Sequence, residues 1–439
     1  MEINFVEPQE IDFFIQSIQE FEVFDIGSKN WLETHEKIIK LNQQAIVEAS
    51  GNREEVVKEL LIIKNKLPIL IHEVLSISVW RKQVLPKLST NSNISGSFFI
   101  YSVLFHESVI LSLLELVLYH ENSCVALEET VVDMIDYCVE GIIYLIGLFQ
   151  DGHHQNEIED SSSEEIDHQK KGILFEIGMK CIIILSYLCD NVSNLSVSVA
   201  RRVTQTHDIP CLLSELLAIR PWLRKCKSFE KFIDGKWVAV EGEEILKVVK
   251  VEAQTWFCLR SIMFQRETFE NYEINSFRQR ELGKCSGLLN DLILEQLPPL
   301  ADLKKFLCTL QISSSHQNNL DRLVLEVVPQ VLNNIIKNAE KKGWNSIIDH
   351  HKKIFVEMDK TNIVDIAKQL NKSYDWDKMI DFEENQEKQR TQTVSKLCAA
   401  CKKEAEKKCS RCQIVFYCCR NCQVKDWNNH KEKCYQYVV

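Results

Sequence analysis

Apolar residues recur at helical spacing along most of the first 385 residues. Within 208–222 they repeat every three or four positions, which places them on one face of a helix: Ile209, Leu212, Leu213, Leu216 and Leu217. Asp208 is positioned to cap this helix, Pro210 falls in its first turn, and Pro221 ends it. Similar apolar stripes predict helices within residues 30–49, 97–120 and 172–188.

Several of these predicted helices are apolar around most of their circumference, so other helices must cover them on more than one side. The pattern therefore predicts a mainly α protein, with a solenoid-like body over residues 1–385. No repeat period is detectable, which argues against a regular TPR or ankyrin array. An irregular armadillo-like or HEAT-like stack is the preferred architecture, and a globular helical bundle is the alternative.

Three segments interrupt the helical pattern. Residues 151–171 are polar and mostly acidic, which predicts a flexible loop within the body. Residues 231–240 place Asp234-Gly235 between two β-prone runs, which predicts a small hairpin. Residues 386–396 are polar and form the predicted linker to a C-terminal module at 397–434.

Net charge, hydropathy and cysteine distribution argue against several classes of function. The net charge of −11 argues against a general affinity of the whole molecule for nucleic acid or anionic membranes. We expect no signal peptide, because the N-terminus is acidic, and no membrane span, because no stretch reaches about 18 uncharged apolar residues. A reducing compartment then makes disulfides a poor explanation for the 17 cysteines. Nine are scattered between residues 124 and 308, and eight lie between 398 and 434.

The clustered cysteines and one histidine form four closely spaced pairs: Cys398 and Cys401, Cys409 and Cys412, Cys418 and Cys422, and His430 and Cys434. Eight such groups are enough for two tetrahedral sites, and thiolates with imidazole favour zinc, so we predict two zinc ions. The spacing does not decide which pairs share an ion. Cys419 is left over and is predicted not to be a ligand. A redox motif is the alternative for the Cys-x-x-Cys pairs, but neither pair opens a helix after a strand.

The positive charge of the C-terminal segment makes nucleic-acid binding an alternative to consider. Residues 396–434 carry a formal charge of +6, which leaves −17 for the rest of the chain. Two zinc ions on seven thiolates would bring this segment to about +3. The spacing does not fit a base-reading finger, which has about twelve residues between its cysteine and histidine pairs. We therefore expect no nucleic-acid partner, and a basic module that docks on protein.

Residues 398–434 resemble the MYND-type zinc finger in all eight ligand positions, in Tyr417, and in the segment 422–427. The resemblance implies interleaved sites, with Cys398, Cys401, Cys418 and Cys422 on one zinc and Cys409, Cys412, His430 and Cys434 on the other. It also implies a protein-interaction module whose groove for short proline-containing peptides would be lined by Gln423 and Trp427. Packing within the small core is an equally good interpretation of Trp427.

MYND fingers also accompany SET-domain lysine methyltransferases, but the sequence lacks the glycine-rich and catalytic segments of that domain. We therefore expect no enzymatic activity. Outside the finger, the chain resembles a family of MYND-finger factors that help chaperones assemble axonemal dynein arms. The segments that carry this resemblance are 40–49, 206–217, 293–307 and 323–331.

That resemblance implies a cytoplasmic protein, at centriolar satellites or dynein assembly particles, that promotes preassembly of inner and outer dynein arms for motile cilia. The implied partners are a leucine-rich-repeat, CS-domain co-factor, heat-shock chaperones, and dynein heavy or intermediate chains as clients. The alternative is a nuclear adaptor that recruits transcriptional corepressors, although no dense basic run outside the finger suggests nuclear import.

Overall fold

The computed structural model describes ten stretches of the chain: residues 5–51, 53–88, 97–150, 165–226, 228–312, 328–356, 398–403, 405, 407–409 and 416–436. The chain divides into two compact units. One spans Asn4–Tyr374, and the other comprises Met1–Ile3 with Asp375–Val439. We call the first unit the body and residues 398–434 the finger. The predicted linker 386–396, and with it the predicted end of the body at residue 385, lies outside the described residues.

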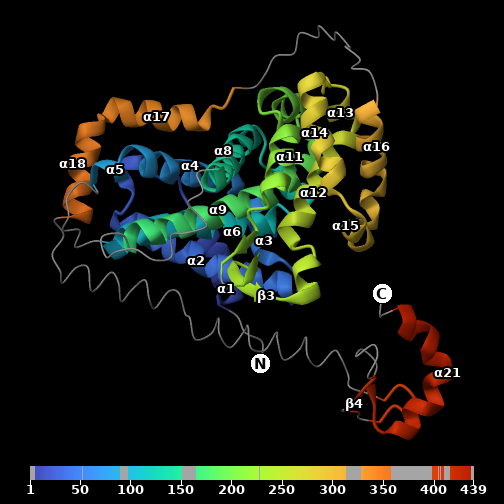
Figure 1. Ribbon diagram of the computed structural model, residues 1–439. Helices are drawn as coiled ribbons and strands as arrows, with labels where there is room; N and C mark the ends of the chain where they lie inside the picture. The colour runs from blue at the N-terminus through green and yellow to red at the C-terminus, as the bar shows by residue number, and fades with distance from the viewer. Residues whose placement is uncertain are drawn as a thin grey trace. The chain divides into compact units, whose positions relative to one another are not determined.

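The body is built mainly of α-helices, which confirms the predicted class (Figure 1). Its first half contains α1 (Pro8–Ser17), α2 (Lys29–Ser50), α3 (Val56–Ile63), α4 (Leu67–Gln83), α5 (Leu85–Leu88), α6 (Ser97–Val117), α7 (Glu121–Val125), α8 (Thr130–Gln150) and α9 (Glu165–Asp190). Its second half contains α10 (Val197–Arg201), α11 (Ile209–Ile219), α12 (Lys250–Phe264), α13 (Arg266–Phe269), α14 (Ser276–Leu288), α15 (Asp291–Gln296), α16 (Ala301–Ile312), α17 (Val331–Lys342) and α18 (Trp344–Phe355). Short 3-10 or π turns lie at η1 (Val23–Asp25), η2 (Val192–Asn194), η3 (Arg202–Thr206), η4 (Gly242–Leu246) and η5 (Pro298–Leu300). The armadillo-like or HEAT-like stacking stays a prediction.

Helix α9 is the centre of the body, because α6, α8 and α12 all pack against it (Figure 1). Its apolar side chains face in several directions and are buried on each, as the sequence pattern requires. The contact with α8 is close: a Cβ added at Gly178 would lie 2.4 Å from Cγ of Leu145. A glycine is therefore needed where these two helices meet.

Two helices are long and apolar enough to cross a membrane by length and composition, over Ile100–Val117 in α6 and Lys170–Asp190 in α9. Both windows contain charged residues, so neither is the stretch of about 18 uncharged apolar residues whose absence the sequence predicts, and the expected absence of a membrane span stays a prediction. Of these two windows, 72% and 83% is buried inside the body. Both helices thus fill the protein core, where neighbouring helices cover their apolar sides.

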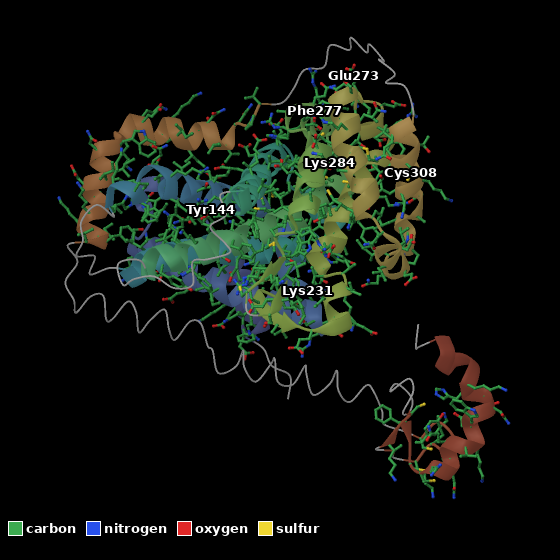
Figure 2. The ribbon with its side chains drawn as sticks, viewed as in Figure 1. Tyr144, Lys231, Glu273, Phe277, Lys284 and Cys308 are labelled. Atoms are coloured by element: carbon green, nitrogen blue, oxygen red, sulfur yellow. The ribbon has the colours of Figure 1, made fainter. Side chains whose placement is uncertain are left out.

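A three-stranded antiparallel sheet lies between α11 and α12, in the order β1 (Leu223–Lys225), β2 (Phe229–Ile233), β3 (Lys236–Val240). Strands β2 and β3 form the predicted hairpin, and the turn between them is Asp234-Gly235, where both residues have positive φ. Strand β1 was not predicted. Lys231 on β2, labelled in Figure 2, is buried, and its Nζ donates hydrogen bonds to the carbonyls of Glu244 and Lys247.

Two local predictions need correction. Helix α9 begins at Glu165, so the last part of the predicted loop 151–171 is helical. Glutamate, glutamine and lysine are good helix formers, and they extend the helix from its buried part. Residues 151–164 lie outside the described residues. Asp208 precedes α11 but makes no capping bond, because its carboxylate accepts from the Tyr272 hydroxyl at 2.7 Å and from Arg278 Nε at 2.8 Å.

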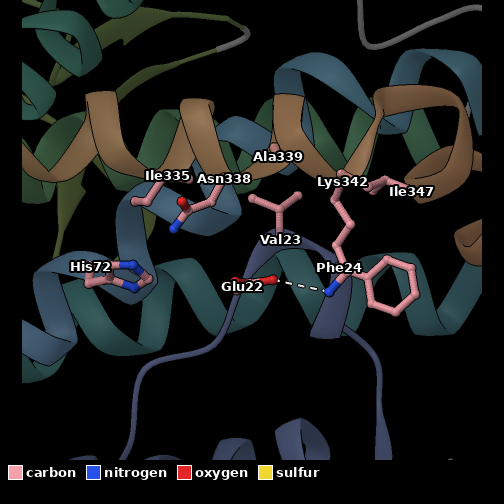
Figure 3. A pocket seen from close by; sticks show the side chains of 9 residues that line it. All are labelled: Glu22, Val23, Phe24, His72, Ile335, Asn338, Ala339, Lys342 and Ile347. Atoms are coloured by element: carbon pink, nitrogen blue, oxygen red, sulfur yellow. Dashed lines mark hydrogen bonds and ion pairs between the residues drawn. The ribbon is translucent and has the colours of Figure 1, made fainter.

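Helices α17 and α18 pack against helices of the N-terminal half of the body that lie far earlier in the sequence; α17, for example, contacts α4 and α8. Asp133 on α8 accepts hydrogen bonds from the first main-chain N–H groups of α17, with Leu332 N at 3.1 Å. Lys342 pairs with Glu22 at 3.0 Å and lies over the ring of Phe24 (Figure 3). The two helices therefore close over η1 and α4 and leave a small pocket between them (Figure 3).

Charged side chains are buried between the helices of the N-terminal half. Glu107 on α6 accepts two hydrogen bonds from Arg81 of α4, at 3.0 and 3.1 Å, and one from the Tyr137 hydroxyl of α8 at 2.7 Å. Its side chain is fully buried. This cluster joins three helices through one carboxylate.

Candidate metal centre

The finger begins with a tight main-chain turn that brings the first cysteine pair together. The N–H of Lys402 donates to the carbonyl of Cys398 at 2.8 Å, and the N–H of Cys398 donates to the carbonyl of Lys403 at 2.7 Å. Lys402 adopts a left-handed conformation with φ of 59°. These bonds fold Cys398 and Cys401 back on each other, as the two-residue spacer requires.

The second pair of this set stands at the start of a helix. A short ladder of β4 (Lys407–Lys408) and β5 (Phe416–Tyr417) leads into Cys418, and α21 (Arg420–Gln436) begins two residues later. Cys422 lies in the first turn of α21. The N-terminus of a helix presents free N–H groups and a partial positive charge, which stabilise thiolates.

These elements bring Cys398, Cys401, Cys418 and Cys422 into one cluster, and their Sγ atoms all lie within 4.8 Å of one another. The Sγ of Cys418 is 3.4 Å from that of Cys401 and 3.5 Å from that of Cys422. Four sulfurs around one zinc ion, each at about 2.3 Å, stand about 3.8 Å apart in a tetrahedron. The cluster therefore fits a zinc ion, and it contains the four residues that the resemblance assigns to one site.

The electrostatics of the cluster favour a cation. Burial opposes ionisation of the Cys398 thiol, but hydrogen bonds from the main-chain N–H groups of Cys418 and Cys401 outweigh it and lower its pKa to about 6. The neighbouring sulfur of Cys401 raises the pKa of Cys418 to about 11, and Cys418 raises the pKa of Cys422. Thiolates this close repel one another, so a divalent cation at their centre would allow all four to ionise.

Of the other predicted ligand set, the structure describes two side chains. Cys409 follows β4 and is buried, and His430 on α21 is also buried, at 4% exposure. Cys412 lies outside the described residues, and the side chain of Cys434 at the C-terminal end of α21 is likewise not described. The assignment of these four residues to a second zinc ion stays a prediction.

Cys419 lies beside the cluster and outside it. Its Sγ is 3.9 Å from that of Cys418, and its side chain is exposed. The group of four mutually close sulfurs does not include it. Its predicted role as a non-ligand is open to a direct test by substitution.

The two residues predicted to line a peptide groove occupy one face of α21. Gln423 and Trp427, four positions apart, are both half-buried. The Trp427 ring packs against the small apolar core of the finger, and its centroid is 6.0 Å from that of His430. Trp427 thus contributes to the finger core while part of its ring stays accessible. Its binding role stays a prediction.

One further contact in the finger joins residues whose pairing is not predictable from the sequence. The hydroxyl of Tyr417, which is buried, donates to Asp426 Oδ2 at 2.8 Å and so ties β5 to α21. Tyr417 was noted from the family pattern, but a hydrogen bond to a carboxylate nine residues away leaves no signal in spacing. This bond fixes the helix that carries Gln423 and Trp427.

Comparison with known proteins places this geometry in a family. The model of the MYND finger family matches residues 398–434. The chain is 40% identical, over 450 aligned residues, to the zinc finger MYND domain-containing protein 10 homolog of Drosophila melanogaster, and the match covers 98% of this chain and 99% of that protein. No solved structure matches the chain. Because the similarity includes the body as well as the finger, the chain belongs to the family of zinc finger MYND domain-containing protein 10.

Proposed function

We propose that this protein is a non-catalytic, co-chaperone-like scaffold for the preassembly and stability of inner and outer axonemal dynein arms. The observation that carries this proposal is the similarity to one relative over nearly the whole of both chains. Body and finger therefore occur together in both proteins. We name dynein-arm assembly as the process because segments of the body resemble dynein-arm assembly factors.

In the finger, the chain's own residues would build a docking surface. A zinc ion, when bound, supplies a fixed cross-link between the turn at Cys398 and the start of α21. The hydrogen bond from Tyr417 to Asp426 holds the same helix from another side. A helix fixed at two points presents Gln423 and Trp427 with little loss of conformational entropy on binding, which favours peptide recognition.

The chemistry of the body's cysteines supports a non-catalytic role. Burial raises the pKa of Cys124 and of Cys211 to about 12, and that of Cys285 to about 11. A thiol with such a pKa carries almost no thiolate at neutral pH and is a poor nucleophile. These cysteines act as small apolar side chains within the helical packing.

Charge supports two kinds of partner. The finger segment carries a formal charge of +6 before metallation, and the rest of the chain carries −17. Surfaces of opposite charge attract different partners, because a partner that is attracted to one surface is repelled by the other. We assign the leucine-rich-repeat, CS-domain co-factor to the finger, and chaperones with dynein heavy or intermediate chains to the body, in the cytoplasm or its dynein assembly particles.

Affinity purification from ciliating cells tests this proposal. The full chain should recover the CS-domain co-factor, heat-shock chaperones and dynein chains, and Cys422→Ala should lose the co-factor. Cys419→Ala is the matched control, since it removes an adjacent thiol outside the cluster. Recovery of nuclear corepressors in place of dynein chains would overturn the proposal and support the transcriptional adaptor.

A further inference from the structure

Strand β3 forms one edge of the sheet in the body. In its pairing with β2, residues Ile233 and Lys236 flank the two-residue turn, and Phe232 stands opposite Trp237. Antiparallel pairs alternate between hydrogen-bonded and non-hydrogen-bonded, and the pair beside such a turn is bonded. Trp237 and Ala239 therefore direct their N–H and C=O groups away from β2.

The opposite strand confirms this alternation. The N–H of Phe232, the residue opposite Trp237, points away from β3 and donates to the carbonyl of Trp222 at 3.0 Å. Within the part of the chain that the structure describes, no hydrogen bond engages the outward main-chain groups of Trp237 or Ala239. Four main-chain groups thus stand along an open edge.

This edge has little of the protection that isolated edges usually carry. Natural edge strands are guarded by proline, bulges or several charged residues. Strand β3 has five residues, with no proline and only Lys236 charged. Val238 is 43% exposed and Ala239 is also exposed. An apolar, unguarded edge is a ready template for another strand.

The strand is also held firmly in place. The Trp237 ring lies 5.4 Å from the rings of both Phe175 and Phe232, and the Arg224 guanidinium stacks on it at 4.1 Å. On the other face, Lys231 ties η4 to the sheet through two carbonyls. A rigid edge loses little entropy on binding a partner strand. In Figure 1, β3 lies at the lower margin of the body.

Acidic residues stand at both ends of the edge. Asp234 lies in the turn before β3, and Glu241 and Glu243 follow its last residue. All three are exposed, and none forms an ion pair with another described residue. The exposed side chain of Leu246 adds apolar surface on η4. The surface is therefore apolar in the middle and negative at the end that carries Glu241 and Glu243, whereas Asp234 at the other end is balanced by Lys236.

We propose that the outer edge of β3 binds an extended segment of a partner protein, which adds to the sheet as a fourth strand. The segment has alternating apolar side chains and basic residues at the end that lies beside Glu241 and Glu243. This site lies on the body and is independent of the finger.

The probe is a fluorescein-labelled peptide of alternating valine and threonine with two lysines at each end, titrated against the full chain by fluorescence anisotropy. Ala239→Pro removes one outward donor and no bond to β2, and proline is tolerated at such edge positions. We expect saturable binding by the wild type, and a Kd about tenfold weaker for Ala239→Pro. Glu241→Gln with Glu243→Gln should weaken binding severalfold, whereas the exposed pair Glu128→Gln with Glu129→Gln should not.

A second measurement keeps the test independent of how the proline variant folds. Hydrogen exchange of the wild type should show new protection at the amides of Trp237 and Ala239 when the peptide is added. The proposal is overturned if the peptide fails to bind saturably or gives no protection at these amides. Equal binding by the Ala239→Pro protein, or by a peptide with glutamate in place of lysine, would also overturn it.

Discussion

Replacing Glu107 by alanine tests whether the buried carboxylate holds three helices of the body together. Its side chain is fully buried, and it accepts two bonds from Arg81 and one from Tyr137. Its removal leaves the Arg81 guanidinium, which is only 16% exposed, without its hydrogen-bonded carboxylate. The Tyr137 hydroxyl, which is also buried, loses its acceptor.

The expected loss is large. Breaking a buried ion pair by removing one partner costs about 3–5 kcal/mol. The free energy of unfolding of a typical domain is about 5–15 kcal/mol, so Glu107→Ala removes a substantial fraction of it. Urea unfolding of the full chain, followed by circular dichroism at the helical band, measures this change, because the body contributes most of the helices.

A matched variant separates charge from packing. Replacing Arg81 and Glu107 by methionine and Tyr137 by phenylalanine removes every polar member of the cluster and keeps similar volume. Because no buried group is then left unpaired, this triple variant should recover most of the lost stability. A loss below about 1 kcal/mol for Glu107→Ala would show that this carboxylate does not hold the three helices together. A triple variant as unstable as the single one would show that the loss does not come from unpaired buried groups.

Three further predictions concern the finger and the body. Metal analysis should give two zinc ions per chain. Cys409→Ala or Cys422→Ala should unfold the finger and leave the helical circular dichroism of the body nearly intact, whereas Cys419→Ala should keep both ions. Trp427→Ala should retain zinc but weaken co-factor binding about tenfold or more, because the accessible part of an aromatic ring contributes strongly to small interfaces. Loss of zinc would instead make Trp427 a core residue. Burial raises the pKa of Glu73 from 4.5 to about 7, so the folded state holds a proton that the unfolded state releases between these values, and stability from this group falls as pH rises through that window. In urea unfolding, the free energy of unfolding of Glu73→Gln relative to that of the wild type should therefore rise by up to about 3 kcal/mol as the pH increases from about 5 to about 8. A stability difference that does not change with pH would contradict the raised pKa of Glu73.

Local signals in the sequence predicted most of the secondary structure. The stripes within 30–49 and 172–188 became α2 and α9, since a 3.6-residue period depends only on the chain itself. The hairpin followed from Asp234-Gly235. Strand β1 was missed because three residues, one apolar and two basic, carry no detectable period. Asp208 was misassigned because its partners lie more than 60 residues away.

Contacts between distant segments had no such signal. Nothing in the sequence indicated that Glu107 is buried against Arg81 and Tyr137, or that the first N–H groups of α17 donate to the Asp133 carboxylate. In the finger, the spacing identified the candidate ligands but left their pairing open, and only the family resemblance supplied it. The structure brings together four of these residues, because the turn after Cys398 and the start of α21 meet at the end of β5.

Deleting residues 396–439 in multiciliated cells tests whether the protein acts as a dynein-arm scaffold through its finger, with full-length Cys419→Ala as the control. If the protein is such a scaffold, the deletion should leave a soluble, folded body that no longer recruits the co-factor. Dynein heavy chains should be depleted from the cytoplasm before cilia form, and ciliary beating should be lost. The control should restore both heavy chains and beating. Normal cytoplasmic heavy chains with normal motility in the deletion cells, or a rescue that requires nuclear import, would contradict a scaffold role.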